Sequence, residues 1–283
     1  MEIKTIALFG KPLFNLVTMT QPIKMATAMP EDEAGFVYIL QGRCTNYSET
    51  EELRLKANQA VLAKCGNSTF STLTINGKTE YKAIAIKFHK DVLEKLYHNV
   101  TSPFSTRTWH KLSVNSTLVE TNELLRNYII GLISYFEHPE LVSEDLLKLK
   151  LNELILLLIH TANAPEVIGI MTNLYEKKTF EFKEIIDAHI YSSLGIEELA
   201  QLNNQSLSTF KKTFKRIYND TPNNYLIRKR IEKVAELLPV SNESITNIAY
   251  QCEFKTLAHM SRVFKAQYGI SPSEYRLNFS DKG

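Results

Sequence analysis

The sequence predicts an α+β protein of several domains: an antiparallel β-domain at the N-terminal end, helices after it, and an all-α domain at the C-terminal end. Three observations predict this fold class. Strand-like runs separated by turn residues fill residues 14–88, helical spacing of apolar residues begins at about residue 91, and two similar helical segments occupy residues 196–275. A chain of 283 residues is long enough for about two compact domains.

Four runs between residues 36 and 88 have the length and composition of β-strands: FVYIL, QAVLAK, STLTI and YKAIAIKF. The last run alternates in the way a half-buried strand does. Asn76-Gly77, between the third run and the fourth, favours a type I′ turn and predicts that these two runs pair as a hairpin. We therefore expect a small antiparallel barrel or sandwich, with the barrel as the preferred form.

Helical spacing continues from Asn115 to Glu137 and stops at Pro139, which predicts a single helix. Ser143 is the expected N-cap of a second helix, whose apolar residues cover more than one stripe. Such a helix must be buried on two sides. A second copy of the chain and the β-domain of the same chain are equally good partners for the additional stripe.

The C-terminal hundred residues contain an internal duplication. Each copy has a short helix that ends in an aliphatic-alanine pair, at Ala200 or Ala249, followed by a turn, a longer helix ending in Phe-Lys, and a Thr/Ser-Pro-x-x-Tyr tail. The small alanine lets the short helix approach the longer one closely. The pattern predicts longer helices over residues 207–217 and 256–267, capped by Ser206 and Thr256, and a helix over residues 222–238 that joins the two copies.

Charge is concentrated in the same region. Residues 203–278 hold twelve basic and six acidic side chains, so this segment has a net charge of +6 and the rest of the chain −4. A basic segment on a slightly acidic protein is expected where only one end meets phosphates. The outward faces of the longer helices carry cations and small or polar side chains, which a helix in the major groove of DNA needs.

The residues that we expect to contact DNA are Ser206, Leu207, Ser208, Lys211, Lys212, Lys215, Arg216, Lys229, Arg230, Lys255, Thr256, Leu257, Ala258, His259, Arg262 and Lys265. Within this set, phosphate contacts are expected from Lys215, Arg216, Lys229, Arg230 and Lys265. Base contacts are expected from the outward faces of the two longer helices.

The motifs ITNIAYQCEF, MSRVFKAQYGISPSEYR and SLSTFKKTFKRIYNDTPNNYL, with the basic helix IRKRIEKVAELL, resemble the AraC/XylS transcription regulators. The N-terminal part is similar to that family's cupin-like β-barrel and helical dimerisation segment only in layout. The resemblance implies a sensor domain over residues 1–100, a dimerisation segment over 101–165 and a DNA-binding domain over 166–283. It also implies a cytoplasmic homodimer that binds double-stranded DNA and contacts RNA polymerase, as an activator rather than a repressor.

The chain departs from the family pattern at four places. Glu253 replaces a glycine, so its turn must adopt its conformation without glycine's freedom. Asn219-Asp220 also replaces a glycine, but asparagine tolerates the left-handed region. Met260 replaces an aromatic residue, and Lys212 stands where arginine is common, which keeps the charge but loses bidentate bonding.

By the same resemblance, the N-terminal domain senses a small effector or a protein partner. Candidate inward residues for an effector site are Phe36, Tyr38, Phe70, Leu73 and Tyr81, although filling the barrel is the preferred interpretation of these side chains. A well-packed interior would favour a protein partner, and a cavity of several hundred Å³ would favour a ligand.

The competing function is a small-molecule-binding or metal-dependent cupin enzyme fused to a helical domain. The seven histidines form no HExxH or HxH cluster, residues 36–80 contain no histidine, and three distant cysteines form no CxxC pair. We therefore expect no catalytic residue, no metal and no cofactor, and reduced thiols. The sequence shows no secretion signal and no apolar run near the roughly 20 residues that a membrane span requires.

Overall fold

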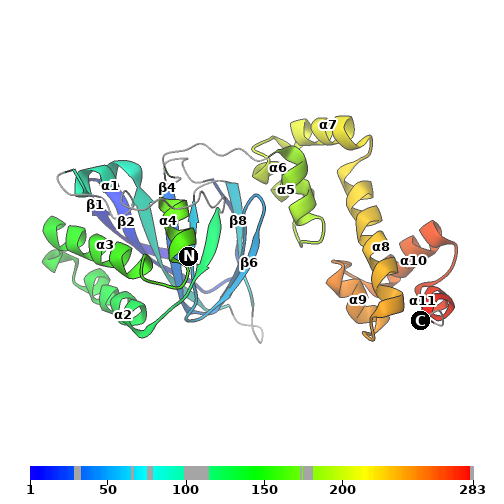
Figure 1. The fold of residues 1–283 in the computed structure, drawn as a ribbon, viewed down its shortest axis with the longest axis horizontal. Helices are drawn as coiled ribbons and strands as arrows, with labels where there is room; N and C mark the ends of the chain where they lie inside the picture. The colour runs from blue at the N-terminus through cyan, green and yellow to red at the C-terminus, as the bar shows by residue number, and fades with distance from the viewer. Residues whose placement is uncertain are drawn as a thin grey trace. The chain divides into compact units, whose positions relative to one another are not determined.

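A computed structural model of the chain describes residues 1–28, 33–64, 67–74, 79–98, 115–172, 174 and 181–280. The chain forms two compact domains, Met1–Phe180 and Glu181–Gly283 (Figure 1). The boundary therefore follows residue 180 and not residue 165. Helix α4 (Ala164–Thr172) belongs to the N-terminal domain because it packs on strands β7 (Ala60–Lys64) and β10 (Ser116–Val119).

The N-terminal domain contains two antiparallel sheets. The larger has the strand order β1-β2-β9-β4-β7-β10, and the smaller has the order β3-β8-β5-β6. The remaining strands are β1 (Glu2–Leu8), β2 (Lys11–Met19), β3 (Lys24–Ala28), β4 (Glu33–Gln41), β5 (Arg43–Tyr47), β6 (Glu52–Lys56), β8 (Asn67–Thr72) and β9 (Tyr81–His89).

The two sheets form a sandwich and not the closed barrel that we expected, because no strand ladder joins them among the residues that the structure describes. The expected hairpin around Asn76-Gly77 is also wrong. Strand β8 pairs with β3 and β5 in one sheet, whereas β9 pairs with β2 and β4 in the other. The Asn-Gly step itself lies outside the described residues.

The central strands β4 and β9 of the larger sheet are buried on both faces. One face, with Ile39 and Ala83, packs against Cys44 and Leu55 of the smaller sheet. The other face packs against helices α1 (Lys90–Leu96), α2 (Glu123–Glu137) and α3 (Glu144–Leu158), together with α4. The domain therefore has three layers: a small sheet, a large sheet and a layer of helices (Figure 1).

The segment before α2 differs from the prediction. Residues 115–137 do not form one helix, because Ser116–Val119 is strand β10, whose residues pair with Ala60–Ala63 at the edge of the larger sheet. Helix α2 starts only after Asn122, whose side chain accepts a hydrogen bond from the amide of Leu125. A 3₁₀ turn, η1 (Pro139–Leu141), follows α2, and Ser143 caps α3 as predicted.

The C-terminal domain contains seven helices in its described residues: α5 (Phe182–His189), α6 (Ile196–Leu202), α7 (Leu207–Tyr218), α8 (Pro222–Val240), α9 (Ile245–Gln251), α10 (Leu257–Tyr268) and α11 (Pro272–Ser280). Helices α6 and α7 form a first helix-turn-helix unit, and α9 and α10 form a second. Helix α8 contacts α7, α9, α10 and α11 and so joins the two units (Figure 1). It extends past the predicted end at Leu238 and includes Pro239 in its last turn.

None of the helices in the described part of the chain has both the length and the apolar composition that crossing a bilayer requires.

Candidate nucleic-acid interface

The longer helices of the two units begin at equivalent caps. The Ser206 hydroxyl accepts a hydrogen bond from the amide of Thr209 at 3.3 Å, and the Thr256 hydroxyl accepts one from the amide of His259 at 3.2 Å. Both predicted caps are confirmed. Helices α7 and α10 each have twelve residues, and each position in α10 corresponds to the position fifty residues earlier in α7.

The turn before each longer helix is also duplicated. The residue after the C-cap of the short helix is left-handed, with φ of 51° at Asn204 and 61° at Glu253. Its amide, and the next one, donate to carbonyls three and five residues earlier, at 2.8 and 2.9 Å in the first unit and 3.0 and 2.9 Å in the second. This is the Schellman arrangement, which normally uses glycine. Glu253 therefore adopts the positive φ that its side chain disfavours.

An aromatic core fixes the inner face of each longer helix. In the first unit, the rings of Phe214, Tyr218 and Tyr225 have centroids 4.4–5.5 Å apart. In the second unit, the aromatic residues fifty positions later form the same triplet, with centroids 4.6–5.3 Å apart. Phe210 and its equivalent Met260 are fully buried one turn earlier. These contacts orient the opposite face of each helix outward.

The outward faces hold most of the side chains that we expected to contact DNA. The exposed ones are Ser206, Ser208, Lys211, Lys212, Lys215, Arg216, Lys255, Thr256, Leu257, Ala258, Arg262 and Lys265, and the half-buried ones are Leu207, His259, Lys229 and Arg230. Helices α7 and α10 contain no acidic residue. The outward face of each longer helix is therefore polar, and its charged side chains are cations.

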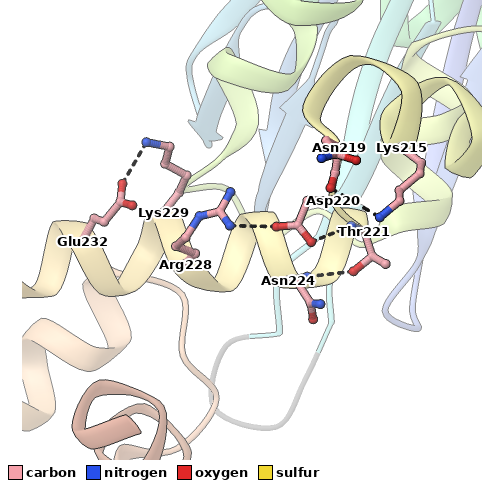
Figure 2. A network of polar contacts seen from close by, with 8 residues as sticks. All are labelled: Lys215, Asn219, Asp220, Thr221, Asn224, Arg228, Lys229 and Glu232. Atoms are coloured by element: carbon pink, nitrogen blue, oxygen red, sulfur yellow. Dashed lines mark hydrogen bonds and ion pairs between the residues drawn. The ribbon is translucent and has the colours of Figure 1, made fainter. Parts of the chain in front are cut away.

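The end of α7 is closed by a left-handed residue of its own. Asn219 has φ of 52°, as its tolerance of this region predicts, and its carbonyl accepts a hydrogen bond from the ammonium of Lys215 at 3.3 Å (Figure 2). A cation at this position also interacts favourably with the C-terminal end of the helix dipole.

The cations at the start of α8 are paired with acids. Arg228 lies 2.8 Å from the carboxylate of Asp220, and Lys229 lies 2.8 Å from that of Glu232 (Figure 2). Helix α8 thus presents less net charge to a phosphate than its sequence IRKRIEK suggests. Lys229 is a weaker candidate for a phosphate contact than the cations of α7.

Arg230 is not placed for the phosphate contact that we predicted. Its guanidinium donates to the carbonyls of Ile190, Ser192 and Glu253, at 3.0, 2.7 and 3.4 Å. Burial lowers the pKa of this guanidinium below its ordinary value. Arg230 therefore ties α8 to the segment before α6 and to the turn of the second unit.

Arg276 has a similar structural role that the sequence did not reveal. It donates to the carbonyl of Leu238 at 2.9 Å and to that of Glu243 at 2.9 Å, and so attaches α11 to the end of α8 and the start of the second unit. From the sequence alone, Arg276 could be recognised only as one of the basic residues of this domain.

The five residues proposed for an effector site do not lie together. Phe36 and Tyr38 face the helices of the N-terminal domain, whereas Phe70 and Tyr81 lie between the two sheets with ring centroids 5.4 Å apart. Leu73 is 42% exposed. The sandwich separates these residues because the central strands β4 and β9 of the larger sheet have two buried faces.

The described residues contain no group of three or more His, Cys, Asp or Glu side chains that could hold a metal ion. Burial raises the pKa of the Cys44 thiol to about 12 and that of Cys252 to about 11. Both thiols are therefore protonated near neutral pH, and the thiol is the unreactive form.

Two domain families match the chain. The ExsA N-terminal regulatory domain matches residues 34–170, and a helix-turn-helix domain matches residues 199–278, which run from α6 into α11. The C-terminal domain is of the AraC type. The resemblance to the AraC/XylS regulators drawn from the C-terminal motifs is confirmed, and the two matches assign a regulatory domain and a helix-turn-helix domain to this chain.

Individual relatives match parts of this chain. The transcriptional regulator ExsA of Pseudomonas aeruginosa is 24% identical over 140 residues, which are 50% of this chain and 49% of ExsA. The transcriptional activator RhaS of Enterobacter sp. (strain 638) is 34% identical over 91 residues, which are 32% of this chain and 33% of RhaS. In both alignments the chain spans less than two thirds of the relative's own length.

Among solved structures, fatty-acid-bound ToxT of Vibrio cholerae aligns over 95% of this chain and 96% of its own, at 18% identity and a TM-score of 0.40.

We predict that Glu253→Gly raises the free energy of unfolding by about 0.5–1 kcal/mol. Glycine removes a left-handed clash that costs other residues about 1–2 kcal/mol, and its greater freedom in the unfolded chain offsets part of this gain. Urea unfolding of the full chain, followed by far-UV circular dichroism, measures the change. Asn204→Gly is the matched control and should give a smaller gain. A loss of stability in Glu253→Gly would contradict the strain assigned to this turn.

We predict that Arg230→Lys lowers the free energy of unfolding by about 1–3 kcal/mol, although it preserves the charge, because lysine leaves buried carbonyls without donors. Lys229→Ala removes only a half-buried ion pair at the surface and should cost about 0–1 kcal/mol. The same urea titration compares the two variants. Equal stabilities would show that Arg230 does not brace the domain.

Proposed function

We propose that this chain is a sequence-specific transcription activator that binds double-stranded DNA through both helix-turn-helix units, under the control of its N-terminal domain. The proposal rests on one observation above all: α7 and α10 have equal lengths, equivalent caps, equivalent aromatic cores and acid-free outward faces. Two such helices on one domain suit successive major grooves, which lie about 34 Å apart on one side of the duplex. The proposed place of action is the cytoplasm, where chromosomal DNA is within reach, and RNA polymerase is the proposed partner.

We propose that the N-terminal domain is the sensor, in the role that a cupin-like domain fills in the family. The space between its sheets is filled by buried side chains that include Met19, Ile39 and Tyr81. Close packing here favours a regulatory protein over a small ligand bound between the sheets.

Dimerisation through α2 and α3 is the third part of the proposal. Helix α3 buries one stripe, including Leu147, Leu151 and Leu154, under its own domain. A second stripe stays open: Leu149 is 67% exposed and Leu156 is 42% exposed.

The open stripe borders a groove of about 480 Å³ between α2 and α3, to which Leu124 of α2 also contributes. Leu149 and Leu156 are seven residues apart and so lie on one face, the spacing at which helices of two copies pack together. We propose that a second copy of the chain covers this groove.

The DNA-binding part of the proposal predicts that Arg262→Ala weakens binding to the preferred site by about 1–3 kcal/mol, the range for one bidentate base contact. Competitive gel-shift titration at constant salt, against the duplex that the unmodified protein selects from a random pool, gives this value. Lys233→Ala is the control, because Lys233 is paired with Glu236 on α8 at 2.9 Å. Unchanged affinity of Arg262→Ala would remove Arg262 from the interface.

The dimer predicts that Leu149→Asp combined with Leu156→Asp halves the mass in sedimentation equilibrium, because two carboxylates would be buried without partners. Leu141→Asp is the matched control, since Leu141 is 72% exposed and does not line the groove. Circular dichroism checks that each variant keeps its fold. If the unmodified chain is monomeric, or the double variant still dimerises, the groove is not the interface.

A further inference from the structure

The two longer helices are equal in length and in capping but differ in the charge that they present. Helix α7 carries four cations, Lys211, Lys212, Lys215 and Arg216. Helix α10 carries two, Arg262 and Lys265. Because positions correspond at a spacing of fifty residues, Lys211 and Arg216 are the cations without a charged counterpart: serine and alanine stand at positions 261 and 266.

The outermost row of each helix shows the difference most clearly. Residues four apart lie one above another on a helix. In α7 this row reads Ser208, Lys212, Arg216, and in α10 it reads Ala258, Arg262, Ala266. All six residues are exposed. Arg262 therefore stands alone on its row, with a methyl side chain one turn before it and one turn after it.

This arrangement suits base recognition by α10. A guanidinium can form two parallel hydrogen bonds to O6 and N7 of guanine, the most frequent specific contact in the major groove. Alanine on both sides leaves room for the helix backbone to come close to the base edges.

Helix α7 suits the phosphate backbone instead. The ammonium of Lys212, at the position equivalent to Arg262, is a point charge without a planar fork. Lys211, Lys212 and Arg216 form no ion pair with any residue that the structure describes, in contrast to Lys229 and Lys233 of α8. Their charge is available to a polyanion, and each phosphate contact releases condensed counterions.

We infer that the two units divide the work of binding: the first unit holds the phosphate backbone and supplies salt-dependent affinity, and the second unit distinguishes bases through Arg262. This inference rests on the proposed DNA binding and deepens it. The two units are alike in architecture and differ in the cations on their outward faces, so the division can be tested by exchanging those residues.

Two variants of the full chain test it. Lys211→Ser combined with Arg216→Ala gives α7 the residues that α10 has at the equivalent positions. The binding constant K of this variant for a labelled random-sequence duplex pool is measured over a range of salt concentrations. The slope of log K against log salt should become shallower by about 0.9 for each cation removed. The base sequence that it selects from the same pool should not change.

Arg262→Lys is the complementary variant, because it keeps the charge and removes the bidentate fork. We expect an unchanged salt slope and a loss of preference at one or two adjacent base pairs of the selected site. Unfolding curves confirm that both variants are folded, as exposed substitutions should leave them.

The outcomes separate the two levels of the proposal. If the unmodified chain binds no duplex and selects no sequence, the proposed function fails. If it binds and selects, but Arg262→Lys keeps the full base preference or the α7 variant changes that preference, the function stands and the division of labour is overturned.

Discussion

The C-terminal domain depends on the left-handed turn that joins a short helix to a longer one in each unit. The turn brings the two helices into contact at an alanine, Ala200 or Ala249, where both side chains are buried. Only because the chain reverses here can Phe214 and Phe264 enter their cores while the polar sides of α7 and α10 face outward. The surface that we assign to DNA is thus a consequence of backbone geometry at Asn204 and Glu253.

A second constraint makes the two units one body. Helix α8 packs against both, and the guanidinium of Arg230 reaches carbonyls that precede the first unit and one in the turn of the second. Arg276 adds an attachment at the far end of α8. These hydrogen bonds join residues that lie about twenty to forty positions apart in the sequence. They therefore determine how the two units are arranged relative to each other, and contribute less to the fold within either unit.

The sequence predicted helices α7, α8 and α10 to within about two residues because their signals are local. Ser206, Thr256 and Pro222 mark helix starts within one turn of the positions that they determine, and Asn219 marks an end. The sheets depend on partners far away in the chain. Residues 116–119 have helical spacing but form a strand because β7 offers them an edge, and a local Asn-Gly signal cannot tell which sheet each flanking strand will join.

The exposure of most candidate DNA-contacting residues could be predicted, but the role of each could not. In a sequence, an arginine that faces solvent looks the same as one whose guanidinium donates hydrogen bonds to backbone carbonyls. The structural roles of Arg230 and Arg276 could therefore not be distinguished from the role expected of Arg262. The sequence could not show which side of the sheet each candidate effector residue faces. Alternation of apolar and polar residues shows that a strand has two faces, but not that both faces are buried.

Bracing by Arg230 also restricts the DNA that the domain can accept. Helices held at a fixed separation by α8 cannot follow a change in the distance between their two target sequences. One extra base pair between those sequences lengthens the gap and rotates one groove by about 35° around the duplex axis, since B-DNA turns once in roughly 10 base pairs. The duplex would have to twist or bend to restore the match, and the elastic energy of that deformation would select the spacing of the operator independently of its base composition.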